Sequence, residues 1–217
     1  MFLRILVAFL ACYFLGNHNG AICVSHMMND DVRSHGSGNA GLTNFIRNYG
    51  ASKSVLVIAI DVLKAVLACL LAGMMFEPFG FGLEGRVLGG VAVMLGHDFP
   101  ALQGFRGGKG ILSGWFIAFM IDWRVGTLIA VVFFAAYLIT QYVSLGSVLA
   151  AATFAVGFAI FHWGNLYVVG GGIFMAALTI FQHRGNIQRL VKGPKSSWET
   201  VHFLVSFPST VSTISNS

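Results

Sequence analysis

Long apolar runs separated by short polar segments dominate the chain. The runs lie at 2–16, 54–76, 86–96, 110–121, 125–140, 145–162 and 165–182. The stretch from Val125 to Gln182 holds 58 residues without an Asp, Glu, Lys or Arg. As a helix it extends over about 87 Å, nearly three crossings of a hydrocarbon core of about 30 Å. Since backbone amides cannot stay unpaired in lipid, the pattern predicts an all-α integral membrane protein with about seven transmembrane helices.

Two of the runs, 86–96 and 110–121, are too short to span a bilayer as straight helices. They flank a polar, glycine-rich break, which membrane proteins tolerate where the backbone lines a cavity. The sequence therefore predicts some short helices with Gly-rich loops in a single membrane domain over 1–193. The remaining residues, 194–217, form a polar and aromatic tail whose composition is compatible with disorder.

Composition agrees with this architecture, since 56% of the residues are hydrophobic and only 10% are charged. A soluble domain carries about 25% charged residues. These values exclude a cytosolic enzyme and a nucleic-acid-binding domain. Cys12, Cys23 and Cys69 form no CxxC pair and lie on or near apolar runs, so we interpret them as small hydrophobic residues.

The distribution of positive charge predicts the orientation. With the N-terminus outside, the outer side receives only Arg4, Arg86 and Arg124. The inner side then receives nine basic residues: Arg33, Arg47, Lys53, Arg106, Lys109, Arg184, Arg189, Lys192 and Lys195. By the positive-inside rule the N-terminus lies outside, and the C-terminus and the polar loops are cytoplasmic. The first run also resembles a signal peptide, but we interpret it as a span because the rest of the chain is membrane-embedded.

Four polar segments lie on the predicted inner side: 36–47 (GSGNAGLTNFIR), 96–110 with GHDFP and FRGGKG, 142–147 (YVSLGS) and 183–189 (HRGNIQR). In the first, glycines alternate with hydroxyl and amide side chains, a composition that can turn N–H donors toward an anion. In the second, Arg106 and Lys109 stand among three glycines and form a candidate phosphate cradle. It is not a Walker A loop, because Gly110 follows Lys109. Together the segments indicate phosphate binding at the inner membrane face.

Other patterns in the chain have weaker support. Gly36-x-Gly38-x-x-Gly41 matches a dinucleotide fingerprint but lacks the preceding strand. Asp61 and Lys64, three residues apart in the second run, are expected to pair or to face a wet cavity. No HExxH or GxSxG motif occurs, so neither metal nor Ser-His chemistry is indicated.

With these segments in this order, the chain resembles the bacterial acyl-phosphate:glycerol-3-phosphate acyltransferase family (PlsY) over roughly residues 1–193. The resemblance implies a seven-helix enzyme of the bacterial inner membrane that acts in phospholipid synthesis. It implies transfer of a fatty acyl group from acyl phosphate to the sn-1 hydroxyl of glycerol 3-phosphate, giving 1-acyl-glycerol 3-phosphate. No metal or cofactor is expected. The expected partners are the two substrates, membrane lipids and the enzyme that forms acyl phosphate, with no nucleic acid.

The resemblance also implies the site residues. The catalytic set comprises Ser37, Arg47, Lys109, His183 and Asn186. The substrate-binding set comprises Gly36, Gly38, Asn39, Thr43, Asn44, Arg106, Gly107, Gly108, Gly110, Ser144 and Arg189. The chain departs from the family pattern at Arg106, where the family usually has Lys, at Leu42 in the GATN segment, at Gly16–Gly20 (usually GSxPxG) and after Gly193, where Pro194 replaces a frequent Glu.

Two rival functions remain open. His26-x4-Asp31 matches the His/Asp pair of acyltransferases that use acyl-CoA or acyl carrier protein. Alternatively, the glycine-broken short helices favour a small phosphate-ester or anion transporter with a midplane site. Against the transporter, the polar segments all fall on one side and the two halves show no internal repeat.

Overall fold

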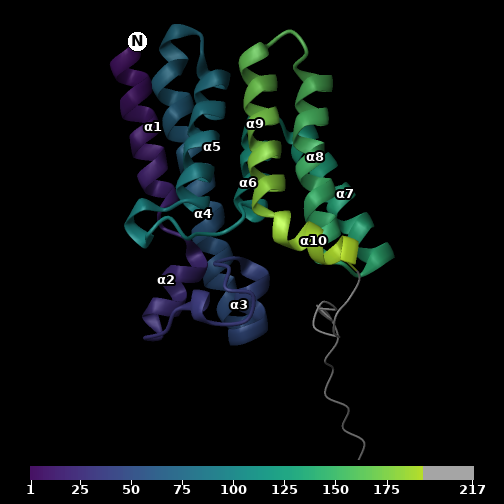
Figure 1. The fold of residues 1–217 in the computed structure, drawn as a ribbon. Coiled ribbons are helices and arrows are strands. Elements are labelled where there is room, and N and C mark those ends of the chain that lie inside the picture. Colours follow the sequence, from purple (N-terminus) through teal and green to yellow (C-terminus); the bar gives the residue numbers. More distant parts are fainter. Residues whose placement is uncertain (193–217) are drawn as a thin grey trace, which may run out of the picture.

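The computed structural model describes residues 1–192, and the predicted tail at 194–217 lies outside the described residues. Within 1–192 all regular structure is helical (Figure 1). The α-helices are α1 (Phe2–Gly16), α2 (Gly20–Met27), α3 (Leu42–Tyr49), α4 (Ala51–Phe76), α5 (Gly82–Asp98), α6 (Ile111–Ile121), α7 (Trp123–Thr140), α8 (Val143–Phe161), α9 (Leu166–Gln182) and α10 (Arg184–Lys192). Short 3₁₀ turns follow at Val32–Ser34, Glu77–Phe79 and Ala101–Gln103.

Seven of these described helices, α1 and α4–α9, run alongside one another and coincide with the seven apolar runs (Figure 1). By length and composition, Ala51–Phe79, α7 and α8 can each cross a membrane alone. The pairs α1–α2 and α9–α10 qualify when each is taken as one bent span, with bends of 44° and 58°. Helix α6 has only 11 residues, as the short fourth run predicts. The all-α membrane architecture is confirmed.

The bend between α1 and α2 is ordered by asparagine side chains. Asn19 Oδ1 accepts a hydrogen bond from Ile22 N at 3.1 Å and so caps α2. Asn17 Nδ2 donates to Tyr13 O at 2.8 Å at the end of α1. Gly16 packs against the backbone of α5, where a Cβ would collide with Val93 O. The segment that departs from the family pattern therefore forms a defined turn.

Helices α2 and α3 form a small layer at the end of the bundle opposite the N-terminus (Figure 1). Its core contains Ile22, Val32 and Phe45 packed against Val57 of α4. Helix α10 lies at the same end of the molecule. The N-terminus and α10 thus stand at opposite ends, as an odd number of crossings requires.

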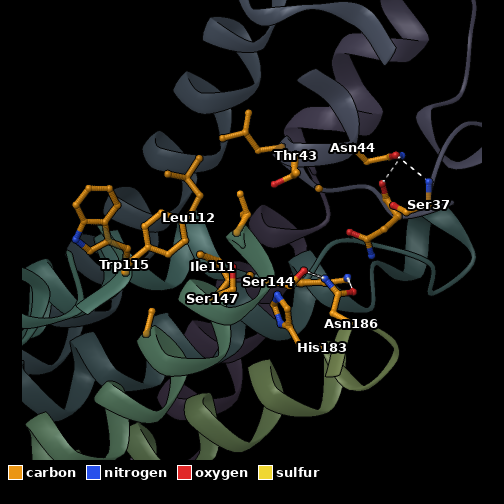
Figure 2. Close-up of a pocket in the computed structure, with 18 of the residues that line it drawn as sticks. Ser37, Thr43, Asn44, Ile111, Leu112, Trp115, Ser144, Ser147, His183 and Asn186 are labelled. Carbon is orange, nitrogen blue, oxygen red and sulfur yellow. Dashed lines mark hydrogen bonds between the residues drawn. The ribbon is translucent and has the colours of Figure 1, made fainter. Parts of the chain in front are cut away.

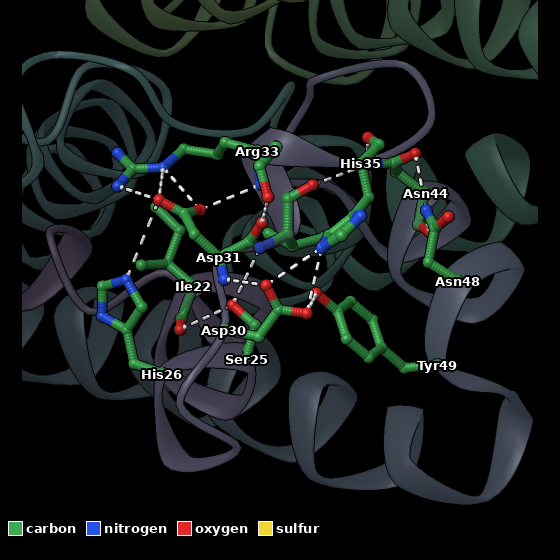
Figure 3. A network of polar contacts seen from close by, with 12 residues as sticks. Ile22, Ser25, His26, Asp30, Asp31, Arg33, His35, Asn44, Asn48 and Tyr49 are labelled. Atoms are coloured by element: carbon green, nitrogen blue, oxygen red, sulfur yellow. Dashed lines mark hydrogen bonds and ion pairs between the residues drawn. The ribbon is translucent and has the colours of Figure 1, made fainter.

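Arg33 links the chain between α2 and α3 to the chain between α5 and α6, and Figure 3 shows its ion pair with Asp31. Arg33 donates to Asp31 Oδ2 from Nη2 at 2.7 Å and to Gln103 O from Nη1 at 2.8 Å. Hydrogen bonds from Arg33 lower the pKa of Asp31 to about 2. Beside them, Asp30 accepts from Tyr49 Oη at 2.8 Å. The two segments that carry most of the predicted site residues are therefore held together.

The chain after α5 folds back onto the end of that helix. Gly107 N donates to Asp98 O at 3.2 Å, and Gly108 N donates to His97 O at 3.1 Å. A Cβ on Gly107 would collide with His97 O, and one on Gly108 would collide with the His97 ring. The paired glycines of FRGGKG are thus required by close backbone approach.

Candidate active site

A cavity of about 1190 Å³ lies where the four polar segments meet. Figure 2 shows Ser144, His183 and Asn186 gathered together, with Ser37 and Asn44 on another wall. The predicted site residues that line the cavity are Gly36, Ser37, Asn39, Thr43, Asn44, Arg47, Lys109, Gly110, Ser144, His183, Asn186 and Arg189. Gly38, Arg106, Gly107 and Gly108 are not among its lining residues. The structure therefore brings most of the predicted residues into one space.

A chain of hydrogen bonds centred on Asn186 joins three elements at the polar end of the cavity. Lys109 Nζ donates to Asn186 Oδ1 at 2.5 Å, and Arg189 Nη2 donates to the same oxygen at 2.8 Å. Asn186 Nδ2 in turn donates to Ser144 Oγ at 2.6 Å. Asn186 thus aligns the loop before α6, the first turn of α8 and helix α10.

The electrostatics of this end favour an anion. Lys109 is half-buried, and within residues 1–192 no carboxylate forms an ion pair with it. Burial, followed by the nearby charges of Arg189 and Arg184, lowers the pKa of Lys109 to about 8. A doubly charged phosphate that pairs with the ammonium group would offset both the cost of burying this charge and its repulsion by the two arginines. The cavity is therefore suited to bind phosphate.

His183 follows the last residue of α9 and is 4% exposed. Its Nδ1 lies 2.8 Å from Thr179 O. Because a carbonyl oxygen can only accept, Nδ1 carries the proton and Nε2 is the acceptor. Burial lowers the pKa of His183 to about 4, so the ring is neutral near pH 7. His183 can therefore accept a hydrogen bond in the cavity.

The glycine-rich turn of the first segment is built around Asn44, which is 3% exposed. Its Oδ1 accepts from Ser37 N at 3.0 Å, and its Nδ2 donates to Val32 O, His35 O and Asn39 O. Because the amide is used fully within the loop, we infer that Asn44 shapes the turn that presents Ser37.

Arg47 occupies the exposed side of α3 at the cavity. Among the described residues its guanidinium has no hydrogen-bond or ion-pair partner. Arg106, by contrast, is exposed outside the cavity lining. Of the three arginines of the predicted site, Arg47 and Arg189 line the cavity and Arg106 does not.

The other end of the cavity is apolar and lies between α6, α7 and α8. Trp115, drawn in Figure 2, is held in place by a hydrogen bond from Nε1 to Gly126 O at 2.9 Å. The other apolar residues that line this end from α6, α7 and α8 include Ile111, Leu112, Phe116, Ile129, Ala130, Phe133, Phe134, Ala150 and Phe154. A cavity with one cationic and one apolar end suits a molecule that carries both a phosphate and an alkyl chain.

The rival His26–Asp31 pair lies outside this cavity, in a shallow surface depression (Figure 3). His26 Nε2 is 4.0 Å from Asp31 Oδ2, while Arg33 occupies both oxygens of that carboxylate. The pair therefore lacks the hydrogen bond by which a carboxylate orients a catalytic base.

The polar residues that line the cavity but were not predicted as site residues include Asn48, Asp61, His97, Ser147 and Gln188. Asp61 pairs with Lys64, Oδ1 to Nζ, at 2.8 Å, as their spacing predicts. His97 lies within the GHDFP segment, so the motif located it, although no role followed from the sequence.

Comparisons with known proteins agree with this geometry. A family model described as glycerol-3-phosphate acyltransferase matches residues 6–193. The chain is 37% identical over 193 residues to the glycerol-3-phosphate acyltransferase of Thermoanaerobacter sp. (strain X514), covering 88% of this chain and 94% of that protein. It is 35% identical over 198 residues to glycerol-3-phosphate acyltransferase 1 of Deinococcus radiodurans, covering 89% and 95%.

Two solved structures have a similar fold. Both are crystal structures of PlsY (YgiH), an integral membrane glycerol 3-phosphate acyltransferase. The glycerol 3-phosphate form has a TM-score of 0.78 and 30% identity, covering 87% of this chain and 92% of that one. The lysophosphatidic acid form has a TM-score of 0.73 and 28% identity, covering 90% and 97%.

Proposed function

The chain belongs to the glycerol-3-phosphate acyltransferase family, and we propose that it moves a fatty acyl group from acyl phosphate to the sn-1 hydroxyl of glycerol 3-phosphate. The product would be 1-acyl-glycerol 3-phosphate, and inorganic phosphate would be released. The observation that carries the proposal is the continuity of the cationic and apolar ends in one cavity. Such a cavity can hold a phosphate and a fatty chain at the same time.

Each end of the cavity receives a part of the substrates. Lys109 holds the phosphate of the donor, together with Ser37 at the opposite wall. The amides of Gly107 and Gly108 do not take part, because they already donate to Asp98 O and His97 O. Arg47, whose guanidinium has no partner within residues 1–192, holds the phosphate of glycerol 3-phosphate with the help of Asn186. The acyl chain lies between α6, α7 and α8.

The chemical step needs little beyond positioning, because an acyl phosphate is already activated. The glycerol oxygen attacks the carbonyl carbon, and the bond from that carbon to the bridging phosphate oxygen breaks. The electron pair leaves with phosphate, and the cation of Lys109 stabilises the developing charge. The hydroxyl proton passes to the departing phosphate or to Nε2 of His183, which the contact of Nδ1 with Thr179 O assigns as the acceptor nitrogen.

The membrane placement follows from charge. The basic residues of the first and second polar segments, of α3 and of α10 all lie toward the end of the bundle opposite the N-terminus. We place this end in the cytoplasm and the N-terminus outside a bacterial inner membrane. The donor then arrives from an acyl-phosphate-forming enzyme on the same side.

The test is release of phosphate by the purified full chain given palmitoyl phosphate and glycerol 3-phosphate, with palmitoyl-CoA as the control donor. We expect release that requires both substrates, with lysophosphatidic acid as the lipid product. Transfer from palmitoyl-CoA alone would replace the proposed donor and direct attention to His26 and Asp31. Uptake of glycerol 3-phosphate into proteoliposomes without acyl transfer would favour the transporter.

A further inference from the structure

His97, which the predicted site does not include, lies beneath the glycine turn of the phosphate cradle. It is the next-to-last residue of α5, it is 4% exposed, and it lines the same cavity as Lys109 and His183. Its carbonyl accepts from Gly108 N at 3.1 Å, and its ring Nε2 faces the side of Gly108 on which a Cβ would stand. The ring is therefore in direct contact with the loop that is proposed to hold phosphate.

Two donors fix the protonation of the ring. Lys64 Nζ lies 2.7 Å from His97 Nδ1, and Asn19 Nδ2 lies 3.4 Å from the same nitrogen. An ammonium group and an amide nitrogen can only donate hydrogen bonds. Nδ1 must therefore be the unprotonated acceptor, and the proton of the neutral ring is on Nε2.

Asp61 does not reverse this assignment. Its Oδ1 is 3.5 Å from His97 Nδ1, much farther than the 2.7 Å that separates Lys64 Nζ from this nitrogen, so the short Lys64 contact decides the assignment. The same oxygen pairs with Lys64 at 2.8 Å and accepts from Gly20 N at 3.0 Å. Lys64 also donates to His18 O at 3.2 Å. Asp61 thus fixes Lys64, and Lys64 fixes the ring of His97.

The Nε2–H of His97 has no hydrogen-bond acceptor among residues 1–192. Within residues 1–192 the fully buried side-chain atoms without a partner are Asp98 Oδ1, Asp98 Oδ2 and Thr179 Oγ1, and His97 Nε2 is not one of them. Because His97 lines the cavity, a ligand bound there can supply the acceptor that the protein does not. His183 has the opposite arrangement, since its Nδ1 donates to Thr179 O and its Nε2 is free to accept. The cavity is therefore lined by one histidine that donates from Nε2 and one that accepts at Nε2.

We propose that His97 is a further phosphate-binding residue, which donates its Nε2–H to a phosphate oxygen held against the FRGGKG turn. The inference rests on the proposed function, because it takes a substrate phosphate as the acceptor. Either the acyl phosphate or glycerol 3-phosphate can supply that oxygen, and the experiment separates them.

The first measurement is the ¹⁵N spectrum of the full chain labelled at histidine, in lipid or detergent at pH 7. The signals of His97 are identified by their loss in His97→Gln, and His162→Gln serves as the matched control. His162 is bonded through Nε2 to Asp122 at 2.9 Å and does not line the cavity. We expect an unprotonated Nδ1 and a protonated Nε2 for His97, whereas a protonated Nδ1 would overturn the proposal.

The second measurement adds ligands and follows binding by calorimetry on the same sample. One arm uses glycerol 3-phosphate, and the other uses an acyl phosphonate in which a methylene replaces the bridging oxygen. We expect the His97 Nε2 signal to shift on binding of one of them. Binding of both ligands without a shift of this signal would contradict the role of His97 but would leave the proposed function intact. Absence of binding of either ligand would instead contradict the proposed function, and the role of His97 with it.

Kinetics separate a contact with phosphate from general support of the fold. We expect His97→Ala to raise the KM of the ligand that shifts the signal by at least tenfold. His97→Gln, whose amide N–H can reach the same region, should recover part of that loss, and His162→Gln should leave KM unchanged. If Ala and Gln lower only the yield of folded protein and leave KM unchanged, the proposal is wrong.

Discussion

Arg47 and Arg106 carry the same charge, yet only Arg47 lines the cavity. A hydrogen bond to a charged group contributes about 1.5–3 kcal/mol, so Arg47→Ala should raise the KM of glycerol 3-phosphate by about 10- to 100-fold. Arg106→Ala is the matched control, with an expected change below about threefold. The measurement is the initial rate of phosphate release against glycerol 3-phosphate concentration. An unchanged KM in Arg47→Ala would remove that residue from the site.

Lys109 should give the reaction a pH dependence, because its pKa is lowered to about 8. The ammonium form binds phosphate and is present below this pKa, so kcat/KM for the donor should fall as pH rises through about 8. Lys109→Ala should abolish turnover without unfolding the protein. Lys109→Arg stays charged across this range, so any activity it keeps should not decline there. The check is lysophosphatidic acid formation from pH 6.5 to 9.5, and a decline shared by both proteins would assign the titration to another group.

At the scale of single residues, the sequence motifs located the residues of the site but did not predict which contacts each of them makes. The motifs located Lys109, Asn186 and Ser144, which the structure joins through hydrogen bonds. They did not predict that the amide of Asn44, which lines the cavity, is used for hydrogen bonds inside its own loop. Nor did they predict a contact for His97, because its partners Lys64 and Asn19 come from distant parts of the chain. Such contacts depend on tertiary packing, which spacing along one motif does not encode.

At the scale of elements, the apolar runs predicted α1 and α4–α9 to within a few residues. Each of these helices is composed mostly of apolar residues, so hydrophobicity alone marks it. The short helices α2, α3 and α10 were not predicted as separate elements. They contain polar residues such as Asn48 and Arg189 and lie at the end of the bundle, where their stability comes from packing.

The apolar end of the cavity should set the length of the acyl chain. Ala130 lines it from α7, whereas Ala135 of the same helix is exposed on the outside. Ala130→Phe should fill part of the space, lowering kcat/KM for palmitoyl phosphate more than for octanoyl phosphate, by at least tenfold in their ratio. Ala135→Phe should leave the ratio unchanged. The measurement is competition between the two donors, and an unaltered ratio in Ala130→Phe would place the chain elsewhere.

At the scale of the whole molecule, the proposed orientation is testable by labelling. Cys12 and Cys69 are buried and Cys23 is half-buried. Replacing all three by Ala gives a cysteine-free background for the labelling. Ser34→Cys then reports on the end that carries the cavity, and Gly164→Cys reports on the other end; both positions are exposed. In intact cells an impermeant maleimide should label Gly164→Cys, and Ser34→Cys only after permeabilisation. The reverse pattern would invert the topology.

Because a cationic and an apolar end are joined in one cavity, the two substrates reach the enzyme from different phases, and their effective concentrations are measured on different scales. Glycerol 3-phosphate dissolves in water, so its availability is a molar concentration. A long-chain donor partitions into the bilayer at about 0.8 kcal/mol per methylene, so its availability is a mole fraction of the membrane. Adding inert phospholipid at constant total donor should therefore slow the reaction, although no bulk concentration of either substrate changes. An apparent KM for the donor therefore depends on the amount of membrane lipid in the assay as well as on the affinity of the enzyme.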